Sequence, residues 1–230
     1  MRLYRDGNGT YRAESLDGLD WLQHGFGTRD SQNWPPGPAA IVKQIHSNLC
    51  ILSHGETGVL GHADALATAT PGVWLAIRTA DCVPVLIVDE RLRAVTAVHA
   101  GWRGTAANIA GAAVQKLAAE FGSKPEDLIA AIGPAICGKC YQVSAEVATQ
   151  FQGWFPERTD LDRQTRIDLP ETNRRQLVAA GVEPDRIAIG APCTLEHAGE
   201  FYSYRRAPEE RGRMVAAIRV APGDAQARTA

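Results

Sequence analysis

RTADCVPVLIVDERLRAVTAVHAGWRG, residues 78–104, is the stretch that decides the fold of this chain. It contains two apolar runs rich in β-branched residues, 83–88 and 94–98, joined by the mainly polar residues 89–92. A strand, a short polar connection and a second strand are the pattern of an antiparallel hairpin. The sequence therefore predicts a β-hairpin at the centre of the fold.

The register of this hairpin decides which side chains meet at its open end. If the turn is centred between Glu90 and Arg91, Cys82 lies directly opposite His99. Directly opposed residues point to the same face of a sheet, with Cβ atoms roughly 5 Å apart. A loop of three or five residues would instead place the two side chains diagonally. The first register puts a thiol and an imidazole side by side.

The composition is that of an ordinary globular protein. The chain has 230 residues, of which 45% are hydrophobic and 22% are charged, so it can bury a substantial core. A formal net charge of −2 gives no reason to expect nucleic acid or an acidic membrane surface as a partner. The longest apolar runs are too short to span a bilayer, and residues 1–14 contain no apolar signal-peptide core.

The chain carries five cysteines, an odd number scattered along its length. This argues for thiols in a reducing compartment rather than a disulfide framework, and the cytoplasm is the expected location. Cys137 and Cys140 form a CxxC motif, but no second CxxC follows to complete a four-thiolate metal site. The sequence therefore assigns no role to this pair.

The periodicity of the chain changes after His99. Before it, short apolar runs between turn residues predict strands. After it, residues 105–121 repeat apolar side chains at helical spacing. Asp168 is expected to cap a second helix that runs to Ala180, with a carboxylate at the capping-box position three residues on.

The order of the expected elements indicates the fold class. Residues 200–206 and 213–220 are expected to be closing strands. Strands in runs, followed by strands alternating with helices, predict an α/β (α+β) fold in which mixed β-sheets are sandwiched by outer helices. We expect one domain over residues 1–220 and a disordered tail over residues 221–230.

One thiol and two imidazoles are the first candidate for a chemical site. Cys82, His99 and His46 are residue types that bind Zn²⁺ together and leave a fourth tetrahedral position for water or substrate. Their spacing matches no compact metal motif. Two other interpretations stay open: a buried cysteine beside a structural histidine, and a dyad in which His99 activates the Cys82 thiolate for acyl chemistry.

Gly101 and Gly104 flank Trp102 and Arg103 at a predicted strand-to-helix turn. Two glycines let the backbone approach a ligand closely, and the following helix N-terminus offers free N–H groups. With Arg103, this turn is a candidate phosphate site. The alternative is that the glycines serve a tight turn and the arginine lies on the surface. Arg29 follows another turn-like segment and is a second candidate for binding an anion.

Asp64 and Asp81 are the candidate acids near the expected ligands, and Asp81 directly precedes Cys82. Either carboxylate could orient an imidazole ligand through a hydrogen bond to its second nitrogen. Each could equally cap a turn.

A series of segments in fixed order resembles the laccase-domain proteins, also called the polyphenol oxidase or peptidoglycan-editing-factor family. The segments containing ADC and VHAGWRG are the most specific. The matching segments are HGFGTR (24–29), KQIHS (43–47), ADALAT (63–68), TADCVPVLIVD (79–89), AVHAGWRG (97–104), IGPAICGKCYQV (132–143), IDLPETNRRQL (167–177), CT (193–194), FYSYRR (201–206) and GRM (212–214).

This resemblance implies a mixed α/β sandwich and a zinc ion held by His46, Cys82 and His99. It also implies action on purine nucleosides, namely phosphorolysis of adenosine, inosine, guanosine or methylthioadenosine, with adenosine deamination alongside. The older label of the family is copper-dependent polyphenol oxidation.

The histidines favour zinc over copper. Multicopper oxidases need a blue-copper site and a trinuclear cluster, and hence many histidines in HxH-type pairs. The six histidines of this chain include no such pair, and Met1 and Met214 are its only methionines. A single three-ligand site with an open position suits zinc Lewis-acid chemistry.

The resemblance also suggests roles for the remaining candidates. Arg103, Arg29 and the backbone of residues 101–104 are expected to hold phosphate for attack at the sugar C1′. Asp81 or Asp64 is expected to orient a ligand or accept a proton. Two other functions stay open: a metal-independent Cys–His hydrolase or amidase acting on cell-wall peptides, and a nucleotide-binding module without activity. A monomer is expected.

Two departures from the family pattern bear on these expectations. Family members usually carry a longer loop and a helix where this chain has only residues 30–42, and that segment is expected to wall the pocket. Cys137 stands where the family commonly has glycine. The substrate range and the role of Cys137 are therefore left open.

Overall fold

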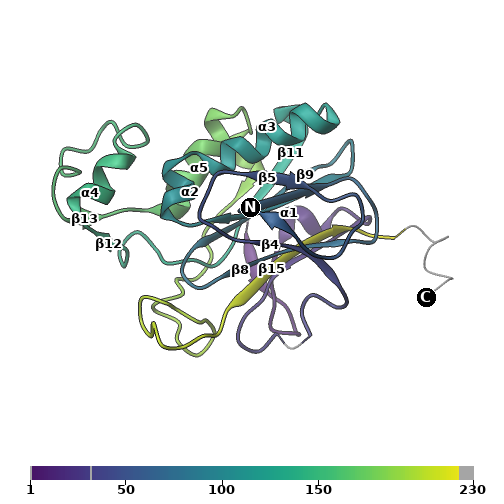
Figure 1. The fold of residues 1–230 in the computed structure, drawn as a ribbon, viewed down its shortest axis with the longest axis horizontal. Helices are drawn as coiled ribbons and strands as arrows, with labels where there is room; N and C mark the ends of the chain where they lie inside the picture. The colour runs from purple at the N-terminus through teal and green to yellow at the C-terminus, as the bar shows by residue number, and fades with distance from the viewer. Residues whose placement is uncertain (1, 32, 223–230) are drawn as a thin grey trace.

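The computed structural model describes residues 2–31 and 33–222, which form two β-sheets packed face to face and a layer of helices (Figure 1). The larger sheet has the order β1-β2-β3-β15-β8-β4-β6 and consists of β1 (Leu3–Arg5), β2 (Tyr11–Ala13), β3 (Leu22–Phe26), β4 (Ala39–Lys43), β6 (Gly58–His62), β8 (Trp74–Thr79) and β15 (Met214–Val220). The second has the order β14-β11-β9-β10-β7-β5 and consists of β5 (Cys50–Leu52), β7 (Ala65–Thr68), β9 (Val83–Asp89), β10 (Ala94–Ala100), β11 (Leu128–Ile132) and β14 (Ile187–Ala188).

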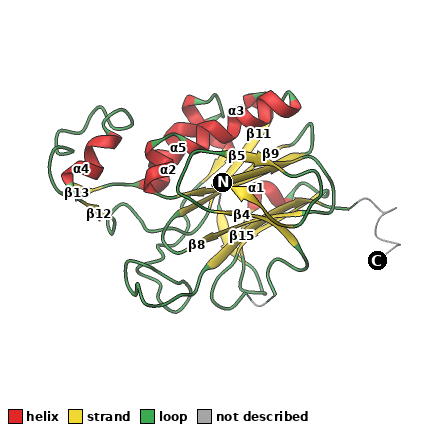
Figure 2. Ribbon diagram, viewed as in Figure 1, coloured by secondary structure: helices red, strands yellow, loops and turns green. Residues whose placement is uncertain are grey.

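The longer helices cover the outer face of the second sheet (Figure 2). They are α2 (Trp102–Ala106), α3 (Ile109–Phe121) and α5 (Leu169–Ala179). The shorter helical segments are α1 (Glu14–Asp17), α4 (Ala145–Ala148) and the 3₁₀ turns η1 (Pro125–Asp127), η2 (Thr149–Phe151) and η3 (Pro184–Arg186). A two-stranded antiparallel sheet of β12 (Gln142–Val143) and β13 (Thr165–Arg166) lies with α4 at the left of Figure 1. No helix in the described ranges has the length and apolarity to cross a membrane.

Both sheets contain parallel and antiparallel pairs, so the predicted α/β fold with mixed sheets and outer helices is confirmed. The central strands β9 and β10 are buried on both faces. Val85 and Ile87 belong to the core beneath the helices, whereas Leu86 and Val88 belong to the core between the sheets. A strand buried on both faces reads as a continuous apolar run rather than an alternating one. This explains the composition of residues 83–88.

The central hairpin forms as predicted, but the predicted register is wrong by two residues. His99 pairs with Pro84 rather than with Cys82, which lies just before β9. Side chains alternate between the two faces of a sheet, so a shift of two residues does not move any side chain to the other face. Cys82 and His99 therefore remain on the same face of the sheet, as diagonal neighbours.

The loop of residues 90–93 causes this shift. The Asp89 carboxylate accepts the N–H groups of Arg91 at 2.9 Å and Leu92 at 2.7 Å. Arg93 closes the loop with a left-handed φ of 54°. An aspartate that bonds to the backbone two residues ahead starts a turn of its own, so the reversal begins at Asp89 and ends at Arg93.

The single helix predicted over residues 105–121 is also wrong, because α2 and α3 meet at a break. Asn108 has a left-handed φ of 63° at this junction. Asparagine tolerates that conformation, which a continuous helix cannot contain. The helix predicted after Asp168 is confirmed, and Asp168 Oδ1 accepts the Glu171 N–H at 2.9 Å.

Of the two closing strands, residues 213–220 contain β15, which lies between β3 and β8 in the larger sheet. Residues 200–206 form turns and irregular structure instead of a strand. The Ser203 hydroxyl and the Arg205 N–H of this segment donate to the Asp81 carboxylate, and the segment makes no strand ladder. The domain bounds of 1–220 stay a prediction. The tail predicted for 221–230 falls mostly outside the described residues.

A buried histidine in β3 should make the free energy of unfolding fall at acidic pH. Burial, with a contribution from Arg12, lowers the pKa of His24 from 6.5 to about 4, and its Nε2 accepts the Ala13 N–H at 2.9 Å. The unfolded chain therefore binds the proton between pH 6.5 and 4 and the folded chain does not, so stability falls as the pH falls through this range. His24→Gln keeps an acceptor and should remove this loss, roughly 3 kcal/mol at most.

The measurement is urea unfolding of both proteins at pH 7 and pH 4.5. The matched control is His62→Gln, because His62 is exposed. If wild type and His24→Gln lose stability equally on acidification, His24 is not the group responsible.

Candidate functional site

Three side chains from distant parts of the chain converge at the open end of the central hairpin. His46 follows β4, Cys82 lies between β8 and β9, and His99 is in β10. Their ligand atoms all lie within 4.8 Å of one another. The two imidazole rings meet edge to face, with centroids 5.0 Å apart. The structure thus brings together the three predicted ligands in a cluster that could hold a metal ion, while their assignment as ligands stays a prediction.

Asp64 holds this cluster in place. Its carboxylate is fully buried, and Oδ1 lies 2.8 Å from His99 Nδ1. The same carboxylate accepts the backbone N–H groups of Ile45, His46 and Ser47, and also the Ser47 hydroxyl. These bonds fix a loop in which the φ of His46 is 61°. They also leave Nε2 of His99 for the cluster, which is how metal-binding histidines are usually oriented.

The electrostatics of the site favour a thiolate. Burial acts to raise the pKa of Cys82, but hydrogen bonds with His46 and His99 lower it to about 6. Burial lowers the pKa of His99, whereas hydrogen bonds with Asp64 and Cys82 raise it to about 9. Burial likewise raises the pKa of Asp64, and hydrogen bonds with His99 and Ser47 bring it to about 2. Since the thiolate is the form of cysteine that binds metals, the cluster is prepared for a cation.

Gly101 and Gly104 let the start of α2 lie directly against the cluster. A Cβ on Gly101 would lie 2.7 Å from His46 Cδ2 and 3.2 Å from Cys82 Sγ. A Cβ on Gly104 would lie 2.6 Å from the Ser47 carbonyl oxygen. Both positions therefore require glycine for packing. A part for either glycine in phosphate binding stays a prediction.

Gly101→Ala should disturb the cluster while leaving the fold intact. The added methyl group would displace the His46 ring, so we expect metal affinity to fall roughly 10- to 100-fold, the range seen when ligand positioning is disturbed. Competition with a chromophoric chelator measures this. Gly153→Ala is the control, because no heavy atom lies within 4 Å of its added Cβ. Equal affinities of the two variants would contradict the packing argument.

Asp81 does not orient a histidine. It anchors the C-terminal loop. Its carboxylate accepts the hydroxyls of Thr194 at 2.6 Å and Ser203 at 3.0 Å, and the N–H of Arg205 at 2.7 Å. Both carboxylate oxygens are used in these bonds. Asp81 also has a left-handed φ of 83° directly before Cys82. Asp81 therefore positions Arg205 and the Cys82 backbone, and a role as proton acceptor stays a prediction.

A cavity of about 880 Å³ opens beside the cluster, within the size range of small-molecule sites. His46, Cys82 and His99 all contribute to its lining. Basic side chains line it as well: Lys43, Arg78, Arg103, Arg205 and Arg213. Aromatic side chains complete the walls: Trp102, Tyr141 and Tyr204. The cavity thus combines a candidate metal cluster, positive charge and aromatic surface.

Arg29 lies elsewhere than predicted. It forms a two-bond ion pair with Glu210, with both N–O distances 2.6 Å, and its guanidinium lies 4.1 Å from the Tyr202 ring centroid. It is not among the residues that line the cavity. Its predicted role with phosphate is untested, and the ion pair already occupies its guanidinium group.

Sequence reasoning missed several cavity residues. Lys43 and Tyr141 lie inside segments that resemble the family, yet neither type nor spacing marks them as functional. Arg78 and Arg213 reach the cavity because β8 and β15 are neighbours in the larger sheet. Only this pairing, between segments far apart in the chain, brings the two arginines to one place.

The segment of residues 30–42 contributes little to the cavity wall. Of its described residues, 30–31 and 33–42, only Val42 lines the cavity. Trp34 packs edge to face against Trp74, with ring centroids 5.1 Å apart, on the outer face of the larger sheet. The effect of this short segment on substrate range remains untested.

The chain is similar in sequence and in fold to known proteins. A family model described as multi-copper polyphenol oxidoreductase laccase matches residues 28–221. A protein of Deinococcus radiodurans named purine nucleoside phosphorylase is 40% identical over 184 residues, which cover 78% of this chain and 69% of that protein.

A protein named adenosine deaminase RL5, from an unknown prokaryotic organism, is 35% identical over 169 residues. This alignment covers 71% of the chain but only 64% of RL5, less than two thirds of its length. The crystal structure of YlmD from Geobacillus stearothermophilus superposes with a TM-score of 0.85 at 28% identity, covering 96% of this chain and 99% of YlmD.

Proposed function

The chain belongs to the family described as multi-copper polyphenol oxidoreductase laccase, and from this membership and the cavity we propose that it is a metal-dependent purine nucleoside phosphorylase. The substrates would be inorganic phosphate and adenosine, inosine, guanosine or methylthioadenosine. The observation that carries the proposal is the His46–Cys82–His99 cluster opening into a basic cavity with aromatic walls. Relatives named purine nucleoside phosphorylase support it.

The donor set fits Zn²⁺. One thiolate and two imidazoles leave the fourth tetrahedral position open, as in catalytic zinc sites. When bound, Zn²⁺ would supply a Lewis acid at that position. A trinuclear copper cluster needs many histidines. Within the described part of the chain, His46 and His99 are the only histidines that share a candidate metal cluster.

The basic side chains would bind phosphate. The Arg103 guanidinium lies 4.3 Å from the Trp102 ring centroid, and Arg205 donates to the Gln142 carbonyl at 3.0 Å. Both arginines are therefore partly ordered before a ligand arrives. Guanidinium groups bind phosphate through paired, charge-assisted hydrogen bonds.

The nucleoside would lie between this phosphate site and the aromatic walls. Trp102, Tyr141 and Tyr204 offer ring faces on which a purine can stack. In phosphorolysis a phosphate oxygen bonds to C1′ while the bond from C1′ to the purine nitrogen breaks. The base leaves with the bonding electrons and takes up a proton. The arginines contribute by holding the attacking phosphate in line.

Adenosine deamination is the second candidate, because a relative is named adenosine deaminase RL5. That reaction replaces the amino group of adenosine with a hydroxyl from water and releases ammonia. It needs no phosphate, so phosphate dependence separates the two reactions.

Product analysis of adenosine with and without phosphate tests the proposal. We expect adenine and ribose 1-phosphate only when phosphate is present, with loss of activity on chelation and recovery with Zn²⁺. Inosine formed without phosphate would show deamination instead. Activity that survives chelation but not thiol alkylation would favour the Cys–His dyad, and no conversion of any purine nucleoside would overturn the enzyme proposal.

Arg103→Ala should weaken phosphate binding selectively. Loss of one charge-assisted contact to phosphate should raise the KM for phosphate roughly 10- to 100-fold, with a smaller effect on the KM for nucleoside. Steady-state kinetics with each substrate varied in turn measures this. The control is Arg163→Ala, which removes an exposed arginine that does not line the cavity. A change confined to the nucleoside KM would contradict the assignment.

A further inference from the structure

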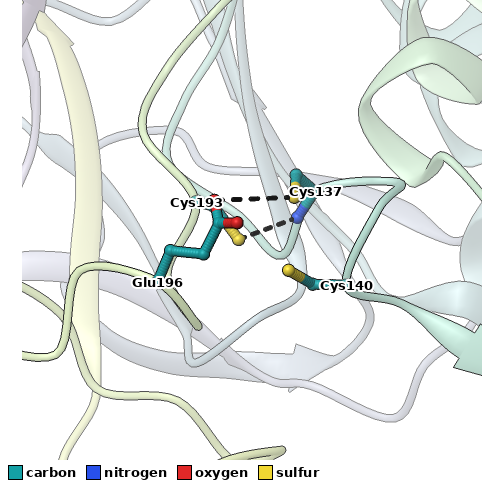
Figure 3. A group of neighbouring side chains, drawn as sticks. All are labelled: Cys137, Cys140, Cys193 and Glu196. Atoms are coloured by element: carbon teal, nitrogen blue, oxygen red, sulfur yellow. Dashed lines mark hydrogen bonds between the residues drawn. The ribbon is translucent and has the colours of Figure 1, made fainter.

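A second group of potential metal ligands lies outside the cavity site. Cys137, Cys140, Cys193 and Glu196 each offer one ligand atom, and these atoms all lie within 4.8 Å of one another. Figure 3 shows the three sulfurs and the carboxylate gathered in one place. All three cysteines are free thiols.

A tight turn brings the first two thiols together. The N–H groups of Cys140 and Tyr141 both donate to the Cys137 carbonyl, at 3.0 Å and 3.1 Å. Gly138 lets this turn lie against the start of α5, because a Cβ there would be 2.6 Å from Asp168 Oδ2. A CxxC turn held in this way is the usual half of a structural zinc site.

The other two ligands come from a segment more than fifty residues later. Cys193 forms a parallel bridge with Ala135, and the Cys137 N–H donates to Cys193 Sγ at 3.3 Å. Glu196 follows one turn later, with Oε2 4.0 Å from Cys137 Sγ. Cys193 is buried and Glu196 is exposed, so the cluster is open to solvent on the carboxylate side. The partner of the lone CxxC is therefore a pair of ligands that the sequence spacing does not reveal.

We propose that Cys137, Cys140, Cys193 and Glu196 bind a second zinc ion with a structural role. Three thiolates and a carboxylate are a tetrahedral set that suits zinc. They would fill all four positions from the protein, in contrast to the three-ligand cluster in the cavity. A closed site of this kind stabilises local structure and leaves no position for substrate.

The position of this site shows what it would stabilise. Thr194, next to Cys193, donates to the Asp81 carboxylate, and Asp81 accepts the Arg205 N–H. Arg206 in turn donates to the Thr194 carbonyl at 2.9 Å. Zinc at the second site would join the turn after β11 to the loop that carries Arg205, and so would fix one wall of the cavity.

Zinc stoichiometry of the full chain, purified with a thiol reductant, tests this proposal. We expect about two equivalents of zinc for wild type, and about one each for Cys140→Ser and Cys82→Ser. The Cys82→Ser protein isolates the second site, so a failure of the cavity site and a failure of this site give different results. Cys50→Ala is the control, since Cys50 belongs to neither cluster, and it should keep the wild-type zinc content.

Cobalt substitution in Cys82→Ser gives a second readout that does not depend on activity. We expect intense thiolate-to-cobalt absorption together with tetrahedral d–d bands, and loss of both in Cys82→Ser/Cys140→Ser. Reduced Cys82→Ser protein that binds no zinc or cobalt would overturn the proposal. So would metal-free wild type whose mass shows a disulfide among these cysteines, because the cluster would then be a redox pair.

Discussion

His99→Ala should remove the metal of the cavity site and lower phosphorolysis of purine nucleosides by roughly 10³-fold or more, about 4 kcal/mol in the barrier. His99 is the most buried member of the cluster and the one that Asp64 orients. Its loss leaves two donors and opens space beside Cys82. Zinc content and kcat/KM for adenosine at saturating phosphate are the measurements.

His62→Ala is the matched control, because His62 is an exposed histidine outside both clusters. It should keep the zinc content and the rate of wild type. If His99→Ala retained wild-type phosphorolysis, the cluster would have no catalytic role. If zinc were lost while activity persisted, the metal would be structural and the reaction would depend on the arginines alone.

Asp64→Asn should damage both stability and metal binding. The carboxylate accepts hydrogen bonds from the backbone of residues 45–47, the Ser47 hydroxyl and the His99 ring with no exposed surface. An amide offers one acceptor oxygen and turns two N–H groups toward these donors. We expect a loss of about 3–5 kcal/mol in the free energy of unfolding, the effect of breaking a buried charged network.

Metal affinity should fall with it by roughly 10- to 100-fold, since His99 loses its orienting carboxylate. Urea unfolding of the metal-free protein separates the stability effect from the metal effect. Asp162→Asn, at an exposed position, is the control for removing one carboxylate. An unfolding free energy within error of wild type would show that the network is not needed for folding.

The sequence predicted which residues form the site better than it predicted their individual roles. Residue chemistry made Cys82, His99 and His46 candidate ligands but left two other interpretations open. The resemblance to the laccase-domain proteins selected the three as a ligand set. The two aspartates were not distinguished. Asp64 hydrogen-bonds to His99, whereas Asp81 hydrogen-bonds to a distant loop. Which partner each carboxylate has depends on the segments that fold over it.

Arg29 and the CxxC motif show the same limit. Nothing near Arg29 in the sequence indicates that it will form an ion pair with Glu210, from the other end of the chain. Nothing near Cys137 and Cys140 indicates that Cys193 and Glu196 will complete their cluster. Local patterns carry no information on such long-range partners.

The amino-acid sequence by itself determined the fold class, the central hairpin, the cap of α5 and the identity of the three candidate ligands. The first three follow from local periodicity and local hydrogen bonding, and the ligand set follows from residue chemistry together with the resemblance to the laccase-domain proteins. The tertiary structure alone decided the hairpin register, the break at Asn108, the basic cavity and the second thiol cluster. The cavity and the thiol cluster depend on contacts between segments far apart in the chain. The register and the helix break depend on the turn that Asp89 starts and on the left-handed conformation of Asn108, which these residue types permit but do not require.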